Sequence, residues 1–332
     1  WFELMLTASF VLVTLGSTPA QLASGFKYLL ISLMASVFFL CACGLAYGWY
    51  GNLDLAKIAE LQSSFSGPGP NMIGGLALVA LAIKSAMFPM YAWLPDAYTA
   101  PPPGIAALLA AVSTKVAAFA LLRIGTALFP PAGGLWFDIL VWAGAATTIA
   151  GALAAVAIND VRRRLAFLLA SQMGTVLVAI GLQSASVVVL LIAHEMVAMA
   201  GLFFAVAALG RTGSSPVARL AVGGGFLVCA LAVAGIPPTS GFVAKFAFVQ
   251  AGLLAENPLA VGAVLLSSLL SLFALLQAWQ STAHESEKSG AKLGWTVPAV
   301  CAATAALALA GGLLAGPIVS GLKETVQGEV LR

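Results

Sequence analysis

The sequence predicts an all-α polytopic membrane protein, with about ten transmembrane helices arranged as inverted five-helix repeats. The first observation is composition: 61% of the 332 residues are hydrophobic and 8% are charged, whereas soluble domains hold about 25% charged residues. The second is a series of apolar runs near the length that crosses a bilayer. The third is that two of these runs are interrupted by proline close to a lysine.

The expected spans follow one another with short polar connections. They are rich in Leu, Val and Ala with Gly and Ser interspersed, as helices that pack on helices in a membrane require. They cover residues 1–17, 25–48, 71–94, 104–128, 135–158, 164–182, 186–209, 217–253, 258–281 and 295–320. The longest polar excursion, Gly51 to Pro70, is predicted to be a loop.

Lysine and arginine are concentrated in loops on one side of the expected bundle. These loops follow the fifth, seventh and ninth spans and hold Arg162, Arg163, Arg164, Arg211, Arg219, Lys288 and Lys292. The opposite loops offer little more than Lys57. The positive-inside rule therefore places the arginine-bearing loops in the cytoplasm and the Gly51–Pro70 loop outside.

The third span carries Lys84 near its middle, followed by Pro89. The proline ring removes the backbone hydrogen bond to the carbonyl of Ser85. A lysine inside hydrocarbon costs a few kcal/mol or more, so it normally faces a protein interior or a water-filled cavity. A helix break at that depth also needs protein or water to satisfy the backbone. The combination points to an ion or proton site; the alternative is a lysine that snorkels from near a helix end.

The eighth span repeats this arrangement. Pro237 and Pro238 free the carbonyls of Val233 and Ala234, and Lys245 follows shortly after. Transporters built from inverted repeats place such broken helices, and the sites they form, near the middle of the membrane.

The spacing of the broken spans predicts how the chain is divided. They are five spans apart, and because five is odd, a copied five-helix unit would enter the membrane from the opposite side. We expect the first repeat over residues 1–128, the second over 129–281, and a loop, a C-terminal transmembrane helix and a tail over 282–332. If the broken helix is fourth in each unit, the first unit lacks its opening helix. The start at Trp1, with no methionine, agrees with the expectation that earlier helices precede this segment.

Few ionisable side chains lie inside the spans, and they fall on successive helices. They are Glu3, Lys27, Lys84, Lys115, His194, Glu195 and Lys245. A proton relay needs groups of this kind, because burial and neighbouring charges tune their proton affinity. The alternative is a set of static ion pairs that only fix helix packing. Lys27, near the start of its span, is also explained as a snorkelling lysine.

Other classes of function find no support in the sequence. Cys41, Cys43, Cys229 and Cys301 lie in apolar runs without metal-type spacing, which indicates packing residues. No Walker A or Gly-rich nucleotide fingerprint follows a strand-like run. The net charge of +3 is small and scattered, which argues against nucleic acid. We expect no cofactor, no metal and no bond chemistry.

Three segments together resemble one family: the antiporter-like subunits of Mrp-type sodium/proton antiporters, respiratory complex I and membrane-bound hydrogenases. Lys84-Ser-Ala-x-Phe-Pro-x-x-x-Trp-Leu-Pro-Asp-Ala resembles the family's central broken helix, and Gly235-Ile-Pro-Pro-x-x-Gly-Phe-x-x-Lys245 its second. Ala166-Phe-Leu-Leu-Ala-Ser-Gln-Met-Gly174 resembles a third family segment. The likeness covers nearly the whole chain and implies the family fold, with about four helices before Glu3.

Within the family, four shorter segments look most like the D-type component of Mrp antiporters. They are Phe2-Glu3-Leu-Met-Leu, Gly25-Phe-Lys27-Tyr28, Lys115-Val-x-x-Phe-Ala-Leu-Leu-Arg123 and His194-Glu195-Met196. The resemblance implies that Glu3 pairs with the central lysine, Lys84, that Lys115 and His194 connect the relay, and that Lys245 ends it. Many members have a lysine shortly after the histidine, where this chain has Met199.

We therefore expect a proton-conducting subunit of a multisubunit cation/proton antiporter in a bacterial cell membrane. Its partners would be other antiporter subunits, H⁺ and a monovalent cation, with Na⁺ favoured by the resemblance. The nearest alternative is the equivalent subunit of complex I or a membrane-bound hydrogenase, where redox chemistry elsewhere drives proton transfer. A non-conducting scaffold subunit, held together by its ion pairs, is the alternative from another class.

Overall fold

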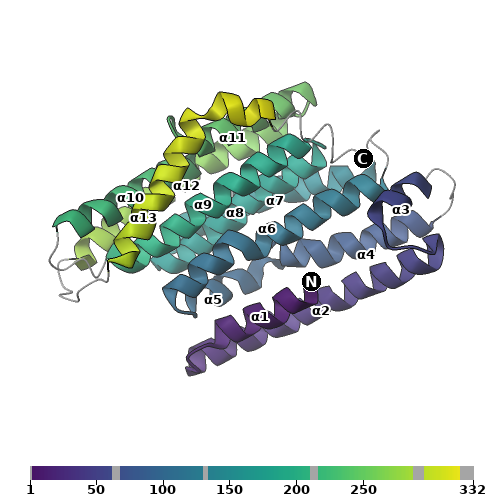
Figure 1. The fold of residues 1–332 in the computed structure, drawn as a ribbon, viewed down its shortest axis with the longest axis horizontal. Coiled ribbons are helices and arrows are strands. Elements are labelled where there is room, and N and C mark those ends of the chain that lie inside the picture. The colour runs from purple at the N-terminus through teal and green to yellow at the C-terminus, as the bar shows by residue number, and fades with distance from the viewer. Residues whose placement is uncertain (1, 62–67, 130–133, 210–215, 287–294, 322–332) are drawn as a thin grey trace.

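The helices lie side by side in one elongated bundle (Figure 1). The computed structural model describes residues 2–61, 68–129, 134–209, 216–286 and 295–321. Arg211, Lys288, Lys292 and the tail at 322–332 lie outside the described residues. Within the described ranges, eight helices are long and apolar enough to cross a membrane, and three shorter apolar helices accompany them.

The elements match the expected spans closely. The first half holds α1 (Phe2–Thr14), α2 (Pro19–Tyr50), α3 (Leu55–Leu61), α4 (Gly69–Lys84), the 3-10 helix η2 (Met90–Trp93), α5 (Leu94–Thr99) and α6 (Pro103–Leu128). The second half holds α7 (Leu135–Ala157), α8 (Val161–Gly181), α9 (Ala185–Leu209), α10 (Pro216–Ala234), α11 (Ser240–Leu254), α12 (Pro258–Ser286) and α13 (Thr296–Leu313). Each span predicted to be broken is a pair of helices: α4 with α5, and α10 with α11.

The loop predicted over Gly51–Pro70 holds one helix that we did not anticipate. Helix α3 occupies residues 55–61 and buries Ile58, which packs in a small apolar cluster with Tyr50, Ile73 and Leu128. The polar residues around it concealed this single apolar anchor, because one buried side chain makes no visible helical period.

Local sequence sets several helix starts. Thr18 forms a capping box with Gln21 ahead of Pro19, so α2 begins with its first N–H groups satisfied. The carboxylate of Asp160 accepts a hydrogen bond of 2.7 Å from the N–H of Arg163 at the start of α8.

Glycines let α7 and α8 pack with their backbones almost in contact. A Cβ added to Gly151 would lie 2.6 Å from the amide nitrogen of Ser171. The hydroxyl of Thr148 donates to the carbonyl of Ser171 at 2.6 Å, and the hydroxyl of Ser171 donates to the carbonyl of Thr148 at 2.7 Å. Small residues and interhelical hydrogen bonds hold helices together in membranes, where the hydrophobic effect is weak.

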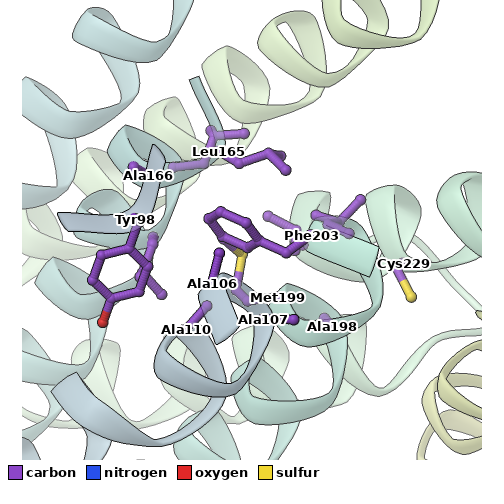
Figure 2. Packing of buried hydrophobic residues seen from close by; sticks show 14 of the residues in the cluster. Tyr98, Ala106, Ala107, Ala110, Leu165, Ala166, Ala198, Met199, Phe203 and Cys229 are labelled. Atoms are coloured by element: carbon purple, nitrogen blue, oxygen red, sulfur yellow. The ribbon is translucent and has the colours of Figure 1, made fainter. Parts of the chain in front are cut away.

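Buried apolar side chains from both halves of the chain meet in one core. Figure 2 shows Tyr98, Met199 and Phe203 beside small residues that include Ala107 and Ala166. The cysteines are free thiols: Cys229 and Cys301 are buried in this core, whereas Cys41 is exposed. Packing is therefore the role of the two buried ones.

The expected cytoplasmic ends of three helices meet at one end of the bundle. The carboxylate of Asp96 in α5 pairs with Lys27 of α2 at 3.0 Å and with Arg163 of α8 at 2.6 Å. Helix α3 lies at the opposite end (Figure 1). Among the described residues, Arg163 and helix α3 therefore lie at opposite ends of the bundle, as the charge pattern predicted for their loops.

Single cysteines test the orientation. We expect Ala59→Cys in α3 to react with an impermeant thiol reagent added outside intact cells, and Asn159→Cys, before α8, to react only after the membrane is opened. Both positions are exposed. Exposed Cys41 is replaced by serine in both variants, and the chain that carries this replacement alone is the control. Labelling of Asn159→Cys from outside, without labelling of Ala59→Cys, would reverse the topology.

Candidate functional site

The first helix break follows Lys84 directly. Helix α4 ends there, and the chain turns through Ala86 with φ of +59°. The N–H of Ala86 donates to the carbonyl of Ile83 at 3.3 Å, and that of Met87 to Ala82 at 2.9 Å, as in a Schellman cap. Glycine is the usual residue at such a position, and an alanine there costs about 1 kcal/mol. Lys84 is therefore at the end of a helix and not at its middle.

The second break has the same backbone pattern. Gly235 takes the left-handed position with φ of +81°. Its N–H donates to Ala232 at 3.0 Å, and that of Ile236 to Leu231 at 2.9 Å. Each break also contains a cis peptide bond before proline, at Pro89 and at Pro238.

Lys245 turns back from α11 to the end of α10. Its Nζ donates to the carbonyl of Val233 at 2.7 Å, one of the two carbonyls that the prolines were predicted to free, and to the hydroxyl of Ser268 at 2.8 Å. A Cβ on Gly235 would lie 2.7 Å from Cδ of Lys245, so glycine here also makes room for the lysine side chain. The register of the two breaks places Val233 where the first break has Lys84. The two lysines therefore lie at equivalent points of their broken spans. Lys84 belongs to the last turn before the first break, whereas Lys245 follows the second break and bonds back to the last turn before it.

A buried ion pair lies between the two breaks. Nζ of Lys115 in α6 is 3.7 Å from Oε2 of Glu195 in α9, and the two side chains are 2% and 0% exposed. The same ammonium donates to the carbonyl of Ala110 at 2.8 Å. Neither carboxylate oxygen of Glu195 has a hydrogen-bond partner within the described residues.

His194 joins this pair to the second break. Its Nδ1 is 3.0 Å from the hydroxyl of Ser240, the first residue of α11. The charges of Lys115 and Lys245 both act on His194 and on Glu195. The structure thus brings together four of the predicted residues: Lys115, Glu195, His194 and Lys245.

Glu3 and Lys84 form the other group. The Glu3 carboxylate acts electrostatically on Lys84, which is 4% exposed. Helix α1 packs on α2 and α6, and α4 packs on α2 and α6 as well. Helix α6, which carries Lys115, is therefore the element shared by the two groups.

Lys27 stands apart from both groups. Its side chain is 63% exposed and pairs with Asp96 beside Arg163 at the cytoplasmic end. Partial burial favours the neutral acid at Asp96, but hydrogen bonds and charges from Lys27 and Arg163 outweigh it, so the pKa of Asp96 lies below its usual range.

Several contributing residues were not identified from the sequence. Ser240 and Ser268 contact His194 and Lys245, and Trp93 donates its indole N–H to the carbonyl of Ile83 at 3.0 Å. A serine in an apolar helix is typical of helix packing, and nothing in its spacing shows what it contacts. Trp93 and Asp96 lie within the segment that resembles the family's central broken helix, but that resemblance did not show which groups they contact. Met199, found where many relatives have a lysine, is fully buried against the aromatic core (Figure 2).

A family model described as "NADH:quinone oxidoreductase/Mrp antiporter, TM" matches residues 1–271. The chain belongs to this family. It is a multi-pass membrane protein with the antiporter-like, all-α fold that the sequence predicted.

Known relatives place the chain more closely within this family. It is 32% identical over 315 residues to the D-type component of a Na⁺/H⁺ antiporter from Alkalihalophilus pseudofirmus, covering 89% of this chain and 63% of that protein. It superimposes on a chain of the Mrp complex from Dietzia with a TM-score of 0.85 and 25% identity, covering all of this chain and 75% of that one. A chain of respiratory complex I from Thermus thermophilus gives 0.82 and 26%, over 97% and 73% of the two chains. The chain thus spans less than two thirds of the sequence relative from Alkalihalophilus.

Removing the Asp96 carboxylate tests the cytoplasmic ion pairs. We expect Asp96→Asn to lower the free energy of unfolding by about 1 kcal/mol at neutral pH, because exposed pairs contribute little each. A carboxylate whose pKa is lowered by folding stabilises above its unfolded pKa, and the effect disappears as pH falls through the folded value. The difference in thermal midpoint between variant and parent should therefore shrink at acidic pH.

The matched control is Asp138→Asn, an exposed carboxylate with no ion pair among the residues described. A pH-independent difference for Asp96→Asn, or an equal one for Asp138→Asn, would show that the pairs do not stabilise the bundle.

Proposed function

We propose that this chain is the proton-translocating, D-type component of a multisubunit Mrp-type cation/proton antiporter. One ion gradient would drive the other, with H⁺ and Na⁺ as the exchanged ions and other antiporter subunits as partners. The buried series Glu3, Lys84, Lys115, Glu195, His194 and Lys245 would carry the proton, with no metal, no cofactor and no bond chemistry.

The observation that carries this proposal is the buried Lys115–Glu195 pair, with His194 and Lys245 in electrostatic range. Removing two charges from water costs several kcal/mol each, and their attraction recovers this only with good geometry and further hydrogen bonds. At 3.7 Å, with neither Glu195 oxygen hydrogen-bonded within the described residues, the geometry is poor for a structural pair. It suits two groups that exchange a proton.

Further buried polar atoms lie on α9, which carries Glu195, and on the helices α6, α8 and α12 that pack against it. Thr114 Oγ1, Gln172 Nε2, His194 Nε2 and Ser271 Oγ are buried without a hydrogen-bond partner among the described residues. Buried polar groups nearly always have a protein or water partner. Internal water would satisfy these atoms and would connect the ionisable groups. It would also carry the proton past Met199, which has no titratable group and stands where many family members have a lysine.

The proposal includes the division into repeats. Residues 1–128 and 129–281 would each form one repeat with one broken span. Residues 282–332 would lie outside the repeats as a loop, a C-terminal transmembrane helix and a tail. The shared backbone pattern at Ala86 and Gly235 supports this division.

The D-type antiporter relatives favour an Mrp complex over complex I or a membrane-bound hydrogenase, whereas the fold matches chains of Mrp and of complex I with similar TM-scores. Neighbouring genes separate the alternatives: small antiporter subunits accompany the first, and iron–sulfur and quinone or hydrogenase subunits the others.

Lys245 is predicted to be obligatory for ion exchange. Lys245→Ala should abolish proton-coupled cation exchange by purified, reconstituted complex, because the ammonium that bonds the carbonyl of Val233 at the second break is then lost. Lys245→Gln keeps a donor for the carbonyl of Val233 and should assemble normally, yet remain inactive. Near-normal exchange by Lys245→Gln would exclude Lys245 as a carrier; Lys57→Gln, on exposed α3, is the control.

Glu3 and Lys84 are predicted to be the switching pair. Glu3→Gln should cripple exchange with little loss of assembled complex, while Glu3→Asp, with a shorter arm, should keep partial activity. Lys84→Arg keeps a charge that cannot be released near neutral pH, so it should fail as a relay. The measurement is exchange in everted vesicles, normalised to assembled complex.

Lys57→Arg is the matched control for Lys84→Arg. If Lys84→Arg transports like the parent, Lys84 is structural. Loss of assembly in all three variants, together with loss of exchange, would instead support the scaffold alternative.

A further inference from the structure

Helix α13 covers the second break with unusually close backbone contact. It packs on α9, α10 and α11, and it lies beyond the residues that the family model matches. Its buried face is made of small residues, Cys301, Ala305 and Ala308. A Cβ on Gly225 of α10 would lie 2.9 Å from the carbonyl oxygen of Cys301, so the helix backbones approach as closely as glycine permits.

Gly311 and Gly312, near the end of α13, face the break itself. A Cβ on Gly312 would overlap the carbonyl oxygen of Pro238 and lie 2.6 Å from the carbonyl carbon of Thr239. A Cβ on Gly311 would lie 2.9 Å from Cβ of Ser240. Both are closer than real Cβ contacts, and the atoms that Gly312 meets are backbone, which cannot swing away.

The break also packs tightly against α10 and His194. A Cβ on Gly241 would overlap the carbonyl oxygen of Ala232 and lie 2.8 Å from Cε1 of His194. Residues 238–241 are therefore in close contact with α13, with α10 and with His194. Ser240 lies in this segment, and its hydroxyl is 3.0 Å from Nδ1 of His194.

We propose that α13 acts as a clamp, by which we mean that it fixes the backbone position of residues 238–241. Gly311 and Gly312 are the positioning residues, and through Ser240 they also fix the orientation of the His194 imidazole. The inference rests on the proposed role of His194 in the relay. Neither glycine touches an ionisable group in the contacts described; each acts through the segment it presses on. An ion-coupled subunit needs such a support because non-helical backbone in a membrane is stable only when protein encloses it.

The test compares Gly312→Ala with Gly316→Ala in the assembled complex. A Cβ at Gly316, which follows the end of α13, meets nothing within 4 Å, so Gly316→Ala changes the same residue type without touching the break. Gly311→Ala meets a side-chain carbon instead of backbone and is the milder variant if Gly312→Ala fails to assemble.

Two readouts are measured. Hydrogen exchange of the 231–242 segment reports the break directly, through the amides of Gly235, Ile236, Thr239 and Phe242 that hydrogen-bond within it. Proton-coupled cation exchange, as a function of pH and per assembled complex, reports the site. We expect Gly312→Ala to speed hydrogen exchange there and to reduce transport roughly tenfold, since small displacements of reacting groups are costly. Gly316→Ala should leave both unchanged.

A double variant tests the route through Ser240. In a Ser240→Ala background, adding Gly312→Ala should reduce transport no further, because the contact it acts through is already gone. Parent-like hydrogen exchange in Gly312→Ala would overturn the clamp. Faster hydrogen exchange with parent-like transport, or full additivity with Ser240→Ala, would overturn its link to His194. If His194→Ala itself transported normally, the proposed relay through His194 would be wrong. The hydrogen-exchange result would still show whether α13 fixes the second break.

Discussion

The need to satisfy backbone groups where two helices break inside the membrane governs this structure. Each break ends in the same cap, with a left-handed residue, Ala86 or Gly235, and two backbone hydrogen bonds. Side chains add further hydrogen bonds: Trp93 donates to the carbonyl of Ile83, which also accepts from Ala86, and Lys245 donates to the carbonyl of Val233. Irregular backbone is tolerated at this depth only when enclosed, and the remaining helices supply that enclosure.

The proposed transport role of Lys245 therefore falls on a residue that also has a structural role at the second break. The ammonium of Lys245 both completes the cap and lies within electrostatic range of Glu195. If a proton left Lys245, the bond to Val233 would be altered, so protonation and backbone geometry at the break are coupled. A change in the charge of Lys245 would therefore act directly on the backbone of the break.

Different forces act at different depths of the bundle. At the expected cytoplasmic end, the exposed pairs of Asp96 with Lys27 and Arg163 tie three helices together at little cost in desolvation. In the middle, glycines such as Gly151 and Gly312 bring backbones into contact. Water is available at the ends to solvate charges, whereas only close packing and hydrogen bonds hold helices together in the hydrocarbon.

The sequence by itself determined the class of fold, the spans, the two breaks and which ionisable residues lie within the spans, because hydrophobic length, proline and charge inside an apolar run are local signals. It did not reveal that Lys84 ends its helix, that Ala86 takes a left-handed position, or that α3 forms. Only the tertiary structure decided which charges meet: Lys115 with Glu195, His194 with Ser240, and Lys27 with Asp96. These contacts depend on the rotation and approach of neighbouring helices. Glycine-to-backbone packing sets that approach, and spacing along one chain does not encode it.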